Sequence, residues 1–456
     1  MSSQFSLMNE QRFRPYFYTQ FLSAFNDNVF KTALVTLVAF HSASLLKMDG
    51  SGIDAGAMAT LLPGLFMLPY FLFSATAGQI ADKFERARLI RLIKMIEIGI
   101  MLFASAGFFM HNIWLLAFAL FMMGTHSTFF GPIKFAYLPQ HLNEHELMGG
   151  NGMVEMGSFV AILLGQILGA WLATQTHHAL VTSLSILFIA TLGYMASRGI
   201  PHSPAPAHAL KINWNPITET FKNLKFSWDH QTIWLALVAI SWFWFYGATV
   251  VAQFPNLAKQ VLHGDESVFI LLLAMFSIGV GTGSLLCEKL SKGKAGLGLV
   301  VFGAIGLTLF GVDLYASSTS IHVSLNDKAI FNYLSFMGVH YNAAGELVLT
   351  YWRLLVDIVL LGLFGGFYIV PLYTLIQTRC ERSHQSRVIA GNNILNALFM
   401  VASAGLSVIF LKQGYSIPQL FLATALLNIV VITYLCFRQP EYIQAFRQWV
   451  KPNNQC

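Results

Sequence analysis

Residues 113–124 read Ile-Trp-Leu-Leu-Ala-Phe-Ala-Leu-Phe-Met-Met-Gly, and residues 269–280 read Phe-Ile-Leu-Leu-Leu-Ala-Met-Phe-Ser-Ile-Gly-Val. Both stretches are apolar on nearly every side, which is typical of a helix surrounded by lipid or by other helices. A β-barrel would instead show strands of about ten residues with alternating polarity, and this pattern is absent from the sequence. Because backbone amides in lipid must be hydrogen bonded within the protein, these stretches predict membrane-spanning α-helices.

The composition of the whole chain supports the same interpretation. Of its 456 residues, 55% are hydrophobic and 11% are charged, whereas a soluble domain carries roughly a quarter charged residues. The apolar residues form blocks of about twenty, the length that a helix needs to cross a bilayer core. We therefore expect an all-α membrane protein with about twelve transmembrane helices.

The blocks divide into six helices, a polar linker and six further helices. We expect a six-helix bundle over 1–200, a cytoplasmic linker with an interfacial helix over 201–231, a second six-helix bundle over 232–438 and a cytoplasmic tail over 439–456. The expected helices lie near residues 16–45, 57–81, 88–110, 113–137, 148–174, 178–197, 232–257, 266–288, 296–317, 348–376, 388–411 and 416–437.

The linker contains the signals of one short helix. Asn215 can cap it and Pro216 suits its first turn, and the run that follows mixes Phe221 and Leu224 with Lys222. This mixture is typical of an interfacial helix, and its expected role is to tether the two bundles. The alternative is a specific lipid-binding role.

Basic residues set the expected orientation. Lys and Arg are concentrated in the loops 83–94, 198–225, 289–294 and 379–387, so both termini should face the cytoplasm. The net charge of +6 follows from this bias and requires no nucleic-acid partner. The sequence shows no phosphate-binding loop, nucleotide fingerprint or metal-ligand spacing, so we expect no cofactor, no metal and no ATP-driven pump.

A short repeat relates the two halves. Pro132 is followed by Gly-Asn-Gly at 150–152, and Pro371 is followed by Gly-Asn-Asn at 391–393, with spacings that differ by two residues. Related halves are typical of transporters whose substrate site lies near the middle of the membrane.

The junction of the second and third helices carries the sharpest motif, Gly-Gln-Ile-Ala-Asp-Lys-Phe-Glu-Arg-Ala-Arg over 78–88. It resembles the signature loop of the major facilitator superfamily, which implies two six-helix bundles that work by alternating access. The resemblance implies that Gly78 permits close helix contact and that Asp82, Arg86 and Arg88 form a charge latch that holds one access state. Glu85 replaces the usual glycine, which argues against a tight turn. The alternative is an ordinary cytoplasmic loop with an aspartate at a helix end.

Four further stretches resemble the bacterial lysophospholipid transporter branch of this superfamily. They are Gln-Phe-Leu-Ser-Ala-Phe-Asn-Asp-Asn at 20–28, Gly-Pro-Ile-Lys-Phe at 131–135, Asn-Gly-Met-Val-Glu at 151–155 and Gly-Gly-Phe-Tyr-Ile-Val-Pro-Leu at 365–372. The resemblance implies movement of lysophospholipids, notably lysophosphatidylethanolamine, to the inner leaflet of the bacterial inner membrane for reacylation. The chain also resembles the transporter module of larger proteins in which it is fused to acyltransferase and acyl-activating domains. The expected partners are a lysophospholipid or another amphipathic small molecule, the membrane lipids and a separate acyltransferase.

Charged residues inside the apolar blocks are the candidate substrate-binding groups. Asp27 and Lys31 are four residues apart and can pair on one helical face. Lys134 and Glu155 offer a second set of opposite charges, and a zwitterionic head group needs both signs. The resemblance implies a head-group or gating role for Asp27, Lys134 and Glu155.

Two uncharged residues complete the candidate site. Asn28 adjoins Asp27, and Gln253 stands in the seventh helix where this branch leads us to expect a basic residue. That departure leaves phosphate recognition in the second half open. The alternative for the charged residues is that they only pair with one another and orient the helices.

Lys94 and Glu97 are three residues apart, and we expect them to be a snorkelling pair at the membrane edge.

Other functions compete with lysophospholipid transport. His322 and Asp327 have the spacing of an acyltransferase motif, but chance supplies such a spacing readily and no enzyme is expected. An exporter of drugs or small hydrophobic solutes, and a membrane anchor or subunit for a separate acyltransferase, are the alternative functions.

Overall fold

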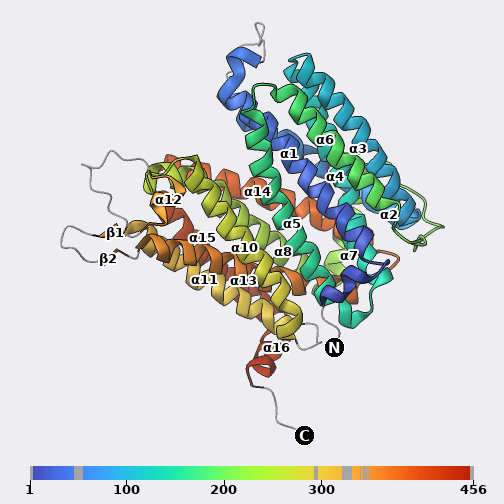
Figure 1. Cartoon of the computed structure of the whole chain (residues 1–456). Helices are drawn as coiled ribbons and strands as arrows, with labels where there is room; N and C mark the ends of the chain where they lie inside the picture. Colours follow the sequence, from blue (N-terminus) through green and yellow to red (C-terminus); the bar gives the residue numbers. More distant parts are fainter. Residues whose placement is uncertain are drawn as a thin grey trace. The chain divides into compact units, whose positions relative to one another are not determined.

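The computed structural model describes residues 4–45, 55–291, 296–320, 331–338, 340–341, 347–348 and 350–451. The described chain is almost entirely helical (Figure 1). Its described strands, β1 (His340–Tyr341) and β2 (Leu347–Val348), form a two-residue antiparallel ladder in which His340 pairs with Val348. The predicted all-α class is therefore confirmed.

The twelve predicted long helices are all present within the described residues. The first half contains η1 (Gln4–Asn9), α1 (Arg14–Leu45), α2 (Ala55–Lys83), α3 (Arg86–Phe109), α4 (Ile113–His141), α5 (Glu144–Ala173) and α6 (His178–Ser197), and the linker helix is α7 (Pro216–Asp229). The second half contains α8 (Gln231–Ala252), α9 (Phe254–Asn256), η2 (Leu257–Val261), α10 (Glu266–Ser291), α11 (Leu297–Thr319), α12 (Tyr333–Phe336), α13 (Thr350–Arg379), α14 (Gln385–Lys412), α15 (Ile417–Arg438) and α16 (Glu441–Val450).

Eleven helices of the described chain are long and apolar enough to cross a membrane. The remaining long helix, α1, carries Asn26, Asp27, Asn28 and Lys31 near its middle. A helix with this many polar groups is costly in lipid unless the groups face the protein interior. The chain is a multi-pass membrane protein.

The seventh predicted helix is less regular than expected. The sequence predicts one helix over 232–257, but α8 ends at Ala252 and is followed by the short α9 and by one π-helical segment, η2. Pro255 accounts for the break, because proline has no N–H to donate and its ring clashes with the carbonyl one turn earlier. The break places Gln253 between two helical segments.

The chain divides into two compact units. The first contains Met1–Gly150, Val160–Trp234 and Ile376–Ala397, and the second contains Asn151–Phe159, Leu235–Leu375 and Leu398–Cys456. Helices α5, α8, α13 and α14 thus contribute residues to both. The bundle boundaries expected from the sequence remain predictions.

In the first unit, α2 packs on α4 while α3 packs on α4 and α6. The apolar core of this unit includes Phe30 of α1, Met101 of α3, Leu120 of α4 and Ile186 of α6, which are fully buried. This core lies in the same helices as the polar side chains described below and holds them in place.

In the second unit, glycines bring α10 and α13 close together. Gly279 and Gly283 of α10 lie against the backbone of Val359 and Leu363, where an added Cβ would overlap a carbonyl oxygen. Gly362 of α13 lies reciprocally against α10. Small residues four apart let helix backbones approach closely in membranes, and the same spacing is used here.

Candidate functional site

A group of polar side chains is buried among α1, α3 and α4 of the first unit. We call it the buried polar cluster, and its members are Asn26, Asp27, Lys94, Glu97, His126 and Ser127. Adjacent residues of α1 face adjacent residues of α4, because Asp27 contacts Ser127 and Asn26 shares Glu97 with His126.

Glu97 of α3 is the centre of this cluster. Its carboxylate pairs with the ammonium of Lys94 and accepts a hydrogen bond from Asn26 Nδ2 at 2.7 Å. His126 Nε2 lies 3.1 Å from Glu97 Oε2. The Lys94, Glu97 and His126 side chains are fully buried, so several contacts offset the cost of burying these charges.

The prediction that Lys94 and Glu97 snorkel at the membrane edge is wrong. Both side chains point into the unit, and Gly193 of α6 leaves the room that Lys94 needs, since a Cβ there would lie 2.7 Å from Lys94 Cε. The sequence gives the spacing of the pair but not the side of α3 that faces protein.

Asp27 has one satisfied and one unsatisfied carboxylate oxygen. Its Oδ2 accepts a 2.5 Å hydrogen bond from Ser127 Oγ. Its Oδ1 is buried and has no hydrogen-bond partner among the described residues. An unpartnered buried acceptor costs free energy, which is typical of a group kept for function.

Lys31 does not form the expected ion pair with Asp27 within the described chain. Its ammonium instead lies 5.3 Å from the centre of the Phe66 ring of α2, a cation–π geometry. The two side chains start four residues apart, but Lys31 turns toward α2 while Asp27 turns toward α4.

Asn28 and Lys134 are the other candidates in the first unit. The Nδ2 of Asn28 donates to the Ala24 carbonyl at 2.8 Å. Lys134 Nζ lies 5.1 Å from the ring centre of Phe135, and the Lys134 carbonyl accepts a 2.5 Å hydrogen bond from Tyr16.

Two predicted site residues belong to the second unit. Glu155 is buried on α5, with 3% of its surface exposed. Gln253 is buried at the break after α8, where its Oε1 accepts a 3.0 Å hydrogen bond from Asn256.

The latch motif is assembled around a close approach of α2 to the start of α14. A Cβ added at Gly78 would lie 2.7 Å from Ala390 Cβ and 2.9 Å from Arg387 Cα. Only a glycine fits this position without movement of the facing helix.

Asp82 completes the first turn of α14. Its Oδ1 accepts from the Ser386 amide at 3.1 Å, and its Oδ2 accepts from the Arg387 amide at 3.3 Å and from Arg387 Nε at 3.1 Å. A carboxylate at this position satisfies free N–H groups and interacts favourably with the helix dipole. Asp82 therefore ties the end of α2 to the beginning of α14.

Arg86 closes the same contact from α3. Its fully buried guanidinium lies 3.3 Å from Asp82 and donates to Ser386 Oγ at 2.9 Å and to the Ala136 carbonyl at 2.8 Å. We call Gly78, Asp82, Arg86, Ser386 and Arg387 the latch.

Arg88 lies outside this arrangement. Its side chain is exposed, and its backbone N–H donates to Glu85 at 2.7 Å. The expectation that Glu85 opposes a tight turn is wrong. With φ −63° and ψ 120°, Glu85 caps α3 and also accepts from the Ser203 amide at 2.7 Å, so glycine is not required.

The sequence analysis missed a charged group in the second unit. Asp357 is 2% exposed and accepts from Ser317 Oγ at 2.8 Å, while Arg353 pairs with Asp313. The available signal was the presence of charged residues inside the apolar blocks of α11 and α13.

The described residues contain no group of three His, Cys, Asp or Glu side chains that could hold a metal ion. The acyltransferase-like spacing of His322 and Asp327 lies outside the described residues. The chemistry available in the first unit is therefore charge and hydrogen bonding around Asp27 and Glu97, together with a charged contact at the end of α2.

The chain is similar to three lysophospholipid transporters along most of its length. It is 26% identical to lysophospholipid transporter LplT of Cronobacter sakazakii over 382 residues, which cover 82% of this chain and 81% of the relative. It is 24% identical to LplT of Klebsiella pneumoniae over 400 residues, 87% of each chain, and 24% identical to LplT of Escherichia coli O127:H6 over 425 residues, 93% of this chain and 94% of the relative.

Solved transporters share the fold. The human organic anion transporter MFSD10 aligns with a TM-score of 0.69 at 13% identity and covers 92% of this chain and 99% of its own. A bacterial homologue of the iron transporter ferroportin aligns with a TM-score of 0.62 at 15% identity, with the same coverage. The model of the Major Facilitator Superfamily matches residues 16–345, and the chain belongs to that superfamily.

Proposed function

We propose that this protein is a secondary transporter that moves lysophospholipids, with lysophosphatidylethanolamine as the preferred class, across the bacterial cytoplasmic membrane by alternating access. The observation that carries the proposal is the similarity to lysophospholipid transporters over up to 93% of the chain. A likeness over nearly every helix favours a shared substrate class over a shared scaffold alone.

The charges of α1 fit this class of substrate. Asp27 has a carboxylate oxygen without a partner among the described residues, which suits an ammonium group, and Lys31, one turn away and directed toward α2, carries the opposite charge that suits a phosphate. A zwitterionic head group would exchange the hydrogen bonds it loses with water for bonds to these two side chains. An exporter of uncharged hydrophobic solutes has no need for such a pair.

The latch is proposed to control access. Its contacts join α2 and α3 to the first turn of α14 through the two carboxylate oxygens of Asp82. A transition that separates these helices must break the contacts of a fully buried charge, so the latch favours the state in which they are formed.

The direction and the partner follow from the substrate. With both termini in the cytoplasm, the latch lies on the cytoplasmic side, and a lysophospholipid delivered there needs a new acyl chain. We therefore propose no enzymatic step within this chain and a separate acyltransferase as its partner.

Uptake by spheroplasts that lack their own lysophospholipid transporter tests the proposal. Labelled lysophosphatidylethanolamine should enter and be reacylated with the wild-type chain, and Asp27→Asn at matched expression should reduce uptake by at least about tenfold, as expected for one lost charged hydrogen bond. Lys211→Gln removes an exposed charge of the linker and should transport normally.

Three outcomes separate the candidate functions. No uptake by the wild-type chain contradicts lysophospholipid transport and favours the solute exporter. Uptake that Asp27→Asn leaves unchanged contradicts the proposed site. If reacylation depends on the presence of the chain although the chain itself transports no lysophospholipid, the result supports a membrane anchor for the acyltransferase.

A further inference from the structure

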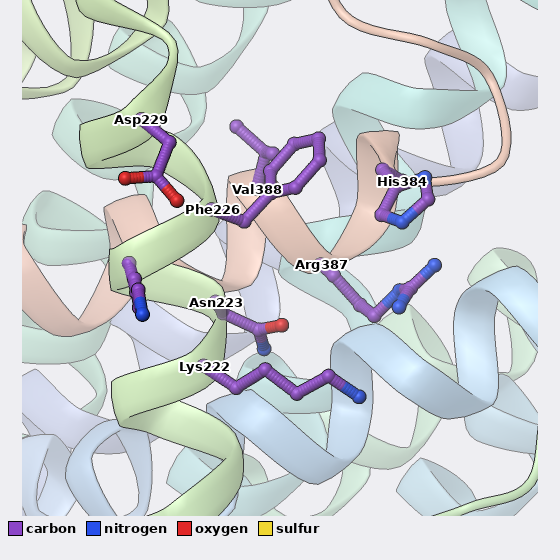
Figure 2. Close-up of a pocket in the computed structure, with 8 residues that line it drawn as sticks. Lys222, Asn223, Phe226, Asp229, His384, Arg387 and Val388 are labelled. Atoms are coloured by element: carbon purple, nitrogen blue, oxygen red, sulfur yellow. The ribbon is translucent and has the colours of Figure 1, made fainter.

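A cavity of about 230 Å³ lies between α7 and the start of α14 in the first unit (Figure 2). Five lining residues come from α7 and three come from the first turn of α14 and the residue before it. They are Lys222, Asn223, Lys225, Phe226, Asp229, His384, Arg387 and Val388.

The charge of this cavity is predominantly positive. Lys222, Lys225 and Arg387 are cationic, and Asp229 is the one carboxylate among the described lining residues. Arg387 is held in place, since its Nε contacts Asp82 and its Nη2 donates to the Ser383 carbonyl at 2.8 Å. The two lysines have exposed side chains without an ion pair among the described residues.

An unsatisfied donor also lines the cavity. Asn223 is 5% exposed, and its Nδ2 has no hydrogen-bond partner among the described residues. A buried amide N–H without an acceptor costs free energy that an oxygen of a bound group would recover. This amide is a separate observation from the charge of the lysines, and it favours the same kind of ligand, one with several acceptor oxygens.

Two stacked aromatic rings form part of the cavity wall. The rings of Phe226 and His384 stack with centroids 4.6 Å apart and planes 7° from parallel. Burial, and after it the neighbouring Arg387, lower the pKa of His384. The stack joins α7 to the start of α14 and keeps Lys222 and Arg387 on the same cavity.

We propose that this cavity binds a phosphate group, held by Lys222, Lys225 and Arg387 and by the amide of Asn223. Tetrahedral phosphate oxygens suit several separate donors. Lys222 and Lys225, which have no carboxylate partner among the described residues, favour an anion, while Arg387 is oriented by Asp82. The site is separate from the buried polar cluster of α1, α3 and α4, and the proposal does not depend on the transported substrate.

Two sources could supply such a phosphate. Ile217, Phe221 and Trp228 form an exposed apolar face of α7, which is typical of a helix at a membrane surface, so one source is the head group of an anionic phospholipid. The other is a soluble phosphate ester of the cytoplasm. Both use the same donors.

Binding to the purified full-length protein distinguishes these sources. Glycerol 3-phosphate is titrated by calorimetry in a neutral detergent, and binding of phosphatidylglycerol is followed by native mass spectrometry in the same detergent. The double variant Lys222→Gln/Lys225→Gln is compared with Lys211→Gln/Lys289→Gln, which removes two exposed lysines that do not line the cavity.

We expect at least one probe to bind the wild-type protein, and its affinity to fall about tenfold or more in the cavity variant and less than about twofold in the control, as for lost charged hydrogen bonds. The probe that shows this difference identifies the source. Absence of binding by both probes, or equal losses in the two double variants, would overturn the proposal. All four substituted lysines are exposed, so both variants should fold.

Discussion

The carboxylate of Asp82 lies where backbone and side-chain donors of α14 meet the guanidinium of Arg86. This arrangement needs Gly78 one turn earlier, because α14 passes too close to α2 for a side chain there. A single hydrogen atom in place of a methyl group thus decides whether the charged contact can form.

Gly78→Ala should weaken the latch. The added methyl group lies against Ala390 and the backbone of Arg387, and overpacking of this kind costs about 1–3 kcal/mol. The thermal midpoint of the purified protein should fall. Gly99→Ala is the matched control, since a Cβ at Gly99 meets nothing within 4 Å and should be neutral or slightly stabilising. Equal midpoints for both variants would contradict the close approach.

Glu97→Gln should destabilise the first unit strongly. It leaves Lys94 buried without its counter-charge, and breaking a buried ion pair from one side costs about 3–5 kcal/mol. The double change Lys94→Met/Glu97→Met removes both charges and should recover most of the thermal stability. A single variant that unfolds at the wild-type midpoint would show that the pair is solvated and not buried.

The sequence predicted one of the two partners in each of these contacts. Gly78, Asp82 and Arg86 stand together in a recognisable motif. Arg387 lies 305 positions away from Asp82, in a loop whose only distinctive feature in the sequence is its basic residues. Asp27 was found as a charge in an apolar block, but its partner Ser127 is a common residue without a distinctive pattern. Partners fixed by tertiary packing leave little trace in local sequence.

At the scale of helices, the cap of α3 connects the loop between α2 and α3 to the linker. Glu85 holds the first amides of α3 and the amide of Ser203 with one carboxylate, and Arg86 N donates to the Ser203 carbonyl at 3.0 Å. The linker segment around Ser203 is therefore hydrogen bonded to the same turn that presents Arg86.

Glu85→Gly, which restores the residue usual for this loop, should destabilise the protein instead of improving the turn. The backbone of Glu85 needs no positive φ, and the change loses both the α3 cap and the contact with Ser203. The expected cost is about 1–2 kcal/mol, measured as a lower thermal midpoint. Glu85→Asp keeps a capping carboxylate and should lose less. A more stable glycine variant would show that the cap contributes nothing.

Element boundaries were predictable where caps and apolar blocks coincide. The sequence placed the linker helix at Asn215 and Pro216, and α7 begins there with the Asn215 side chain accepting from two amides. The irregular segment after Ala252 was not anticipated, because the apolar block continues through Pro255 and hides the break.

At the scale of the whole molecule, the basic loops predict the orientation of the chain in the membrane. The linker should lie in the cytoplasm, and the connection between α5 and α6 should lie on the opposite side. His208 of the linker and His177 before α6 are both exposed, so a cysteine at either position can be labelled without unfolding.

In intact spheroplasts, a membrane-impermeant maleimide should label His177→Cys, and it should label His208→Cys only after permeabilisation. The comparison uses a Cys456→Ser background, since Cys287, Cys380 and Cys436 are buried. The reverse pattern would place the termini and the latch outside, and lysophospholipid import toward a cytoplasmic acyltransferase would then be excluded.

The most direct test is transport by the purified chain in sealed proteoliposomes loaded with labelled lysophosphatidylethanolamine in one leaflet. Our account predicts that the wild-type protein moves the lipid to the other leaflet, that Lys211→Gln does the same, and that Asp27→Asn moves it at least about tenfold more slowly. Equal rates in protein-free vesicles and in vesicles with the folded wild-type chain would contradict the claim that this protein transports lysophospholipids.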